Sequence, residues 1–185
     1  MKRTTCILAV VLVALWGCRG FAEQKTADSI TVRIVPTSTD AQGRNIHLYK
    51  KSEHFYVVIT NVSGNPIRLW REWNSWGYDN LSFVLVGSTG RNTVISKRPI
   101  GAWAKNSPDS AILAPGDHMV IEVTFDDETA QGETMWLNAP APETGDPLQI
   151  KMKAVYAIVA NRDTKKYGIW TGRAFSPEDT YTISR

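Results

Sequence analysis

The segment EHFYVVITNVSGNPIRLW occupies residues 53–70 and predicts two extended strands joined by a tight turn. Phe55, Val57 and Ile59 alternate with the intervening side chains, as expected of a strand that buries one of its two faces. Residues 61–66, NVSGNP, favour a turn because Asn and Ser bond to the local backbone, Gly tolerates positive φ and Pro fixes φ. An apolar run then resumes in residues 67–70. We expect the rest of the chain to pack around this central hairpin.

The same period of two recurs on both sides of the hairpin, and no window of eleven or more residues after residue 22 keeps a helical apolar period. Before it, we expect a first strand ended by Pro36, a polar loop over residues 37–45 and a short edge strand over 46–49. Further predicted strands cover residues 81–85, 93–96, 119–125, 148–159, 169–172 and 181–183. Residues 114–117, APGD, suit a type II turn, residues 139–147 form a long connection, and residues 161–168 form a polar turn. The pattern predicts an all-β, antiparallel β-sandwich with long loops and about 7–9 strands.

The amino terminus has the layout of a secretory signal peptide. Lys2 and Arg3 precede an apolar run over residues 7–16, which is about half the roughly 20 residues needed to span a bilayer. Small residues before Glu23 predict cleavage there, giving a signal over residues 1–22 and one β-sandwich domain over 23–185. Residues 15–18, LWGC, leave a second outcome open, a bacterial lipoprotein signal in which Cys18 carries the lipid, although Trp16 departs from that pattern.

Without the signal, the charges of the chain balance. Lys2, Arg3 and Arg19 all precede Glu23, so 18 basic residues remain against 18 acidic ones. This balance favours neither a nucleic-acid partner nor an anionic membrane surface. Both cysteines, Cys6 and Cys18, also precede Glu23. The predicted mature domain therefore has no disulfide, and its core must stabilise it alone.

Two segments resemble domains of a known class. Residues 57–69, VVITNVSGNPIRL, are similar to a strand–turn–strand of bacterial extracellular immunoglobulin-like domains, and residues 113–125 are similar to a turn and late strand of the same domains. Bacterial intracellular proteinase inhibitor domains share both features. The resemblance implies an immunoglobulin-like sandwich and no functional residue, because sandwiches carry many unrelated activities.

No motif for nucleophilic, phosphate-binding, dinucleotide-binding or zinc chemistry is present, so we predict no catalytic residue, metal site or cofactor. By strand parity His54 and His118 face outward, and His47 lies near an edge, so surface histidines explain them. Asp117 and the acidic run over residues 126–128 could supply oxygen ligands to calcium. Acidic residues at a strand end are also common turn formers, and no glycine-spaced ligand pattern accompanies them.

The most unusual composition is WREWNSWGY at residues 70–78, with Trp103 in a later loop. Aromatic side chains gathered on sandwich loops could stack on sugar rings or anchor a protein partner. The alternative is that Trp70 and its neighbours plug the open end of the sandwich, with their indole N–H groups bonded to loop carbonyls. The candidate binding residues are Trp73, Asn74, Trp76, Tyr78 and Trp103.

These features predict an exported, non-catalytic module of the bacterial envelope that binds an unidentified protein or glycan or serves as an accessory domain. It would be periplasmic, extracellular or lipid-anchored, with no nucleic-acid partner and no membrane contact beyond the signal or lipid anchor. Two alternatives remain open. The first is a small secreted hydrolase that uses two facing carboxylates. The second is a proteinase inhibitor with an exposed loop over residues 98–110.

Overall fold

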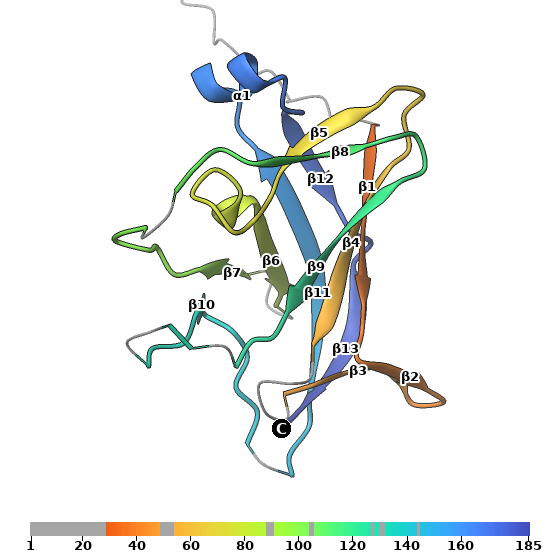
Figure 1. Cartoon of the computed structure of the whole chain (residues 1–185). Coiled ribbons are helices and arrows are strands. Elements are labelled where there is room, and N and C mark those ends of the chain that lie inside the picture. Colours follow the sequence, from red (N-terminus) through yellow and green to blue (C-terminus); the bar gives the residue numbers. More distant parts are fainter. Residues whose placement is uncertain are drawn as a thin grey trace, which may run out of the picture.

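The computed structural model describes residues 29–48, 54–87, 91–103, 106–126, 128–129, 132–143 and 145–185 (Figure 1). The predicted signal, Cys6 and Cys18 lie outside these residues. The strands in the described part are β1 (Ile30–Val35), β2 (Ser38–Asp40), β3 (Gly43–His47), β4 (Phe55–Asn61), β5 (Ile67–Trp70), β6 (Leu81–Val86), β7 (Asn92–Lys97), β8 (Ser110–Leu113), β9 (His118–Val123), β10 (Trp136–Leu137), β11 (Leu148–Ile158), β12 (Gly172–Phe175) and β13 (Asp179–Ser184). A 3-10 helix, η2 (Tyr78–Asn80), and one short α-helix, α1 (Arg162–Tyr167), complete them. The chain is an all-β sandwich, as predicted, and its strand number exceeds the prediction because several strands are very short.

The sandwich consists of two main sheets with a core between them. One sheet has the order β1-β4-β9, and the larger has the order β10-β7-β6-β11-β13-β3-β2, with β12 also paired to β11. Neighbouring strands are antiparallel except β3 and β13, which are parallel. In β4 every second residue is buried, so the predicted inward set is confirmed there. Phe55 of the smaller sheet packs against Phe83 of the larger, with ring centroids 5.6 Å apart, which places the core between the sheets.

The predicted central hairpin is wrong in its pairing. The strand, turn and strand all exist, but β4 pairs with β1 and β9, whereas β5 pairs with β8 in a separate two-stranded ribbon. The β5–β8 ribbon crosses the end of the sandwich that carries α1 (Figure 1). The turn over residues 61–66 therefore bends the chain out of one sheet and into the ribbon.

Asn61 holds this corner. Its side chain is fully buried, and its amide nitrogen donates to the carbonyl oxygens of Asn65 and Leu113 at 2.8 and 2.9 Å. Its Oδ1 accepts from the backbone N–H and the hydroxyl of Ser63 at 2.9 and 2.7 Å. The predicted turn over residues 114–117 lies beside it: Gly116 has φ +86° and donates its N–H to the Asn61 carbonyl at 2.8 Å. The two bends are thus hydrogen-bonded to each other.

Four predicted segments differ from the structure. Residues 37–45 contain β2 and the start of β3 instead of a loop, and β3 lies between β13 and β2 instead of at an edge. Tyr49, the last residue of that predicted edge strand, lies outside the described residues. The polar turn over residues 161–168 contains α1, and residues 169–171 precede β12 instead of belonging to a strand. Within the described residues, no helix has the length and apolar character needed to cross a membrane.

Candidate binding groove

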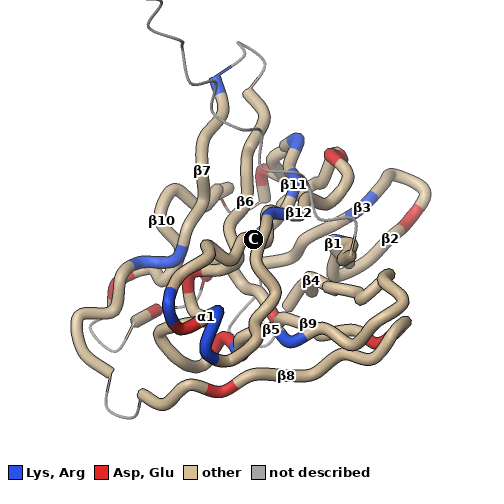
Figure 2. The backbone as a smooth tube through the Cα atoms, turned by 90° about the horizontal axis from the view of Figure 1, so that it is seen from above, with Lys and Arg blue, Asp and Glu red and all other residues tan. Residues whose placement is uncertain are grey.

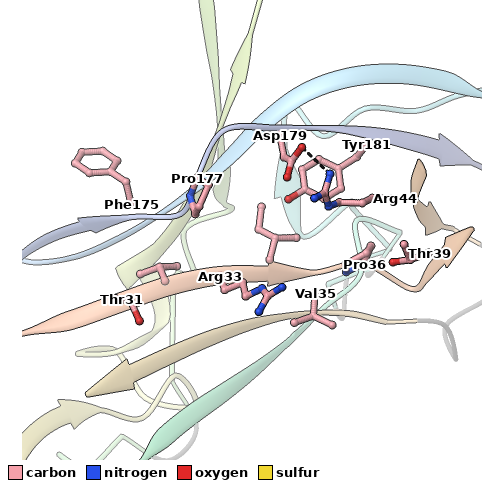
Figure 3. A pocket seen from close by; sticks show the side chains of 12 residues that line it. Thr31, Arg33, Val35, Pro36, Thr39, Arg44, Phe175, Pro177, Asp179 and Tyr181 are labelled. Carbon is pink, nitrogen blue, oxygen red and sulfur yellow. Dashed lines mark hydrogen bonds and ion pairs between the residues drawn. The ribbon is translucent and has the colours of Figure 1, made fainter. Parts of the chain in front are cut away.

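A groove of about 990 Å³ runs along β1, between this strand and the segment that joins β12 to β13 (Figure 3). One wall is β1 together with Pro36. The other wall is formed where β12 passes into β13, by Phe175, Pro177, Asp179 and Tyr181. Protein pockets that bind ligands have volumes of about 300–1,000 Å³. The groove is therefore large enough for a ligand or a short stretch of peptide.

Within the part of the chain that the structure describes, no strand pairs with one side of β1, and this side faces the groove. Opposite residues of an antiparallel pair alternate between hydrogen-bonded and non-bonded pairs. The N–H of Val62 donates to the carbonyl of Ser29 at 3.0 Å, so in the β1–β4 register Thr31, Arg33 and Val35 form the hydrogen-bonded pairs. The N–H and C=O groups of Val32 and Ile34 consequently point away from β4. β1 is the terminal strand of its sheet, so they face an open edge.

The groove has an apolar floor and a mixed rim. Val32, Ile34 and Tyr181 line it although they are only 3–5% exposed, so it reaches the core between the sheets. On the rim, Val35 and Phe175 are 38% and 42% exposed. These two side chains place exposed apolar surface beside the apolar floor of the groove.

Three charged side chains line the groove. Arg44 and Asp179 form an ion pair with N···O 2.7 Å (Figure 3), whereas Arg33 has no ion-pair partner among the described residues. Burial, and next the charge of Asp179, raise the pKa of Tyr181 to about 12, so its hydroxyl stays protonated at neutral pH. The groove therefore offers a phenol that can donate a hydrogen bond, and its outer rim carries the Arg33 guanidinium, which has no ion-pair partner among the described residues.

Comparison of this chain with protein-family models, with curated proteins and with solved structures gave no match.

The aromatic loop predicted as the binding site does not form one exposed platform. Asn74 is fully buried, and its Oδ1 accepts the N–H groups of Trp76 and Gly77 at 3.0 and 3.1 Å. Its amide nitrogen donates to the Asp109 carbonyl at 3.2 Å. A Cβ at Gly77 would lie 2.0 Å from the Arg71 carbonyl oxygen, so the turn requires glycine. Asn74 thus shapes the loop instead of presenting a contact.

Trp76 and Tyr78 also serve the fold. The indole N–H of Trp76 donates to Asp163 of α1 at 2.8 Å, and its ring lies 6.1 Å from that of Trp70. Tyr78 is buried and donates its hydroxyl to the Arg98 carbonyl at 3.1 Å. The end of the sandwich is therefore plugged by aromatic rings, as the alternative interpretation predicted. The predicted indole bond to a loop carbonyl is wrong for Trp76, whose N–H donates to a carboxylate, and the carbonyl bond is made by the Tyr78 hydroxyl.

Trp103 and Trp73 complete the predicted set. Trp103 is half-buried and packs edge-on against Tyr78, with centroids 5.5 Å apart. The amine of Lys97 lies 4.7 Å from the Tyr78 ring centroid and 3.4 Å from a carboxylate oxygen of Glu72. Trp73 is 51% exposed. Of the five candidate residues, Trp73 presents the most surface to a partner.

We expect Trp76→Ala and Trp73→Ala to differ in stability. Trp76→Ala removes a packed ring and leaves Asp163 without its indole donor, so the free energy of unfolding should fall by about 2 kcal/mol or more. Trp73→Ala alters an exposed side chain and should change the free energy of unfolding by about 0.5 kcal/mol or less. Urea titration of both variants measures the difference. Equal losses would show that Trp73 is packed into the plug as well.

The three histidines lie at different places in the fold. His118 is exposed on β9 opposite Thr60, as predicted. His54 precedes the other end of β4, so about 20 Å of strand separates the two. His47 of β3 has hydroxyl partners, the Oγ atoms of Ser38 at 3.1 Å and of Ser184 at 2.9 Å. A serine hydroxyl beside a histidine is one element of a hydrolytic site, but Ser38 does not line the groove.

The acidic residues considered for calcium lie apart. Asp117 accepts the N–H of Ala114 at 3.0 Å in the turn before β9, whereas Asp126 pairs with Arg185 at 2.6 Å beyond the end of β9. Asp127 lies outside the described residues. Across the described part of the chain, no group of three or more His, Cys, Asp or Glu side chains is placed to hold a metal ion.

The sequence did not reveal the groove. Its residues come from five strands in two distant parts of the chain, β1 to β3 and β12 to β13, and their proximity depends on which strands pair. One local signal existed: Arg33 stands on the outward face of a strand that ends at Pro36, and a charged residue with a nearby proline is common on an edge strand.

Proposed function

We propose that this chain is an exported, non-catalytic β-sandwich module that binds a protein partner through the groove beside β1. The observation that carries the proposal is the open edge of β1, whose unpaired N–H and C=O groups border a groove with an apolar floor. An edge of this kind can hydrogen-bond to a partner backbone, while the groove accommodates its side chains.

Two further features support the proposal. The charged amino terminus, the apolar run over residues 7–16 and the small residues after it favour export. Basic and acidic residues alternate along the described backbone instead of gathering by sign (Figure 2), a distribution that favours a protein partner over a nucleic acid.

The proposal is tested by panning a displayed library of random peptides against the wild-type protein. A groove variant, Phe175→Glu, and a control variant, Ile112→Glu, then report where the enriched peptides bind. Ile112 is 62% exposed on β8 and does not line the groove. We expect the peptides to bind wild type and Ile112→Glu and to lose at least tenfold in affinity for Phe175→Glu. Equal binding to all three proteins, or no enrichment, would contradict a peptide-binding groove.

A glycan-binding function is the second candidate, and the exposed indole of Trp73 favours it. Aromatic rings on loops stack on the apolar faces of sugars. A glycan array probed with wild type and Trp73→Ala tests this candidate. A glycan signal that Trp73→Ala abolishes would support it, whereas an array without signal would remove it. The hydrolase and the proteinase inhibitor with a loop over residues 98–110 remain predictions from the sequence.

A further inference from the structure

We propose that β1 takes up an extended, acidic segment of a partner protein as an additional strand of the β1-β4-β9 sheet. This inference rests on the proposed function and names the chemical class of the partner. It assigns the binding energy to main-chain hydrogen bonds along β1 and the preference among partners to Arg33.

The backbone geometry defines the hydrogen bonds. Val32 and Ile34 each direct one N–H and one C=O away from β4. Residues two apart on a strand are about 6.6–6.8 Å apart, which matches the spacing of the corresponding groups on an incoming strand. Residues 31–35 of β1 border the groove, so a segment of about five residues would pair beside them.

The side chains on the two faces of β1 define the sequence of that segment. Because successive side chains of a strand point to opposite faces, every second residue of the partner would enter the groove. There it would meet the buried Tyr181 and the exposed ring of Pro177, so an apolar residue fits. The residues between would lie beside Thr31, Arg33 and Val35 on the outer face. We therefore expect alternating apolar and acidic residues.

The charges select an acidic partner over a basic one. Asp179 is already paired with Arg44 at 2.7 Å, whereas Arg33 has no ion-pair partner in the described part of the chain. Opposite charges on neighbouring strands stabilise the pairing, and like charges destabilise it. An acidic side chain beside Arg33 would supply the missing counter-ion.

The same charge disfavours a second copy of this chain. If β1 paired with β1 of another molecule, the two Arg33 side chains would lie opposite or diagonal to each other, at a separation where like charges repel. Natural proteins use charged residues on edge strands in this way to prevent self-association. The structure thus favours a different, acidic partner strand.

The experiment uses the full chain, labelled with ¹⁵N, and two capped eight-residue peptides. One alternates valine with glutamate, and the other alternates valine with lysine. Dissociation constants come from chemical-shift titration, and amide hydrogen exchange is measured with and without peptide. We expect the glutamate peptide to slow exchange at Val32 and Ile34 at least tenfold, with little change at Arg33, whose N–H is already bonded to β4.

Charge variants test the preference. We expect the glutamate peptide to bind roughly fivefold or more tightly than the lysine peptide, since one attractive pair is exchanged for a repulsive one. Arg33→Glu should reverse this order. Arg162→Glu is the matched control, because Arg162 is exposed on α1 and does not line the groove. Thermal melting of both variants verifies that they remain folded.

The outcomes separate this inference from the proposed function. If library peptides bind in the groove but Val32 and Ile34 gain no protection, strand addition is wrong and the groove still binds. If both peptides bind equally well, the acidic preference is wrong. Protection at these residues that rises with protein concentration alone would indicate a second copy instead. If no peptide of any kind binds at the groove, both proposals fail.

Discussion

Replacing Asn61 by Ala is expected to lower the free energy of unfolding by about 2–4 kcal/mol, since each buried polar group left unpaired costs about 1–3 kcal/mol. The fully buried Asn61 side chain bonds the carbonyls of Asn65 and Leu113 and orders Ser63. The bond to Leu113 is itself buried and ties the β5–β8 ribbon to the end of β4. Loss of this bond should destabilise the turn over residues 61–66 together with the β5–β8 ribbon.

Urea unfolding followed by far-ultraviolet circular dichroism measures this effect. Asn65→Ala is the matched control, because Asn65 is exposed and accepts the Asn61 bond with its backbone carbonyl, which alanine keeps. The control should change stability by about 0.5 kcal/mol or less. A loss below about 1 kcal/mol for Asn61→Ala would indicate that the corner is held by the strands alone.

Phe83→Ala is expected to cost still more, about 3–5 kcal/mol, because it combines lost burial with a cavity. Phe83 is 0% exposed, and its ring lies 5.4–5.6 Å from those of Phe55, Phe125 and Trp136. It lies at the centre of the contact between the two sheets.

Leu85→Ala is the matched comparison for this prediction. Leu85 stands on the same face of β6 but is only partly buried, so its truncation should cost less than that of Phe83. The same urea titration measures both. A larger loss at Leu85 than at Phe83 would place the centre of the core further along β6.

The strands with one buried face were predictable from the sequence, but not all of their partners were. In β1 and β4 the apolar residues alternate, and burial follows the same alternation. The turn over residues 61–66 was also evident. Its residues specify a change of direction, whereas the pairing of β5 with β8 joins residues that lie 40 to 46 positions apart in the chain. Local sequence carries no direct record of such contacts.

Polar segments concealed the other elements. The strand β2 is exposed throughout, so its residues show no apolar alternation. The helix α1 has six residues, too few for a helical period, and its local signals are its caps. Asn161 accepts the N–H of Thr164 at 2.9 Å, and Gly168 ends the helix with φ +63°. Asn followed by Gly seven residues later was a readable signal of that helix.

The aromatic loop shows that a binding site is equally hard to predict from local sequence. Its composition indicated tryptophans near the end of the sandwich, and they lie there. Whether an indole is packed or exposed depends on neighbours such as Asp163, which comes from α1 far along the chain. The groove was harder still to predict from the sequence, because a sheet edge is open only when no other strand pairs with it.

Amide hydrogen exchange of the free protein, resolved by residue, tests whether β1 has an open edge. We expect alternating protection along β1: slow exchange at Thr31 and Arg33, whose N–H groups bond to β4, and exchange at least tenfold faster at Val32 and Ile34, although their side chains are buried. Uniformly slow exchange from Thr31 to Ile34 at low protein concentration would show that another strand already covers this edge, which leaves no place for a partner strand.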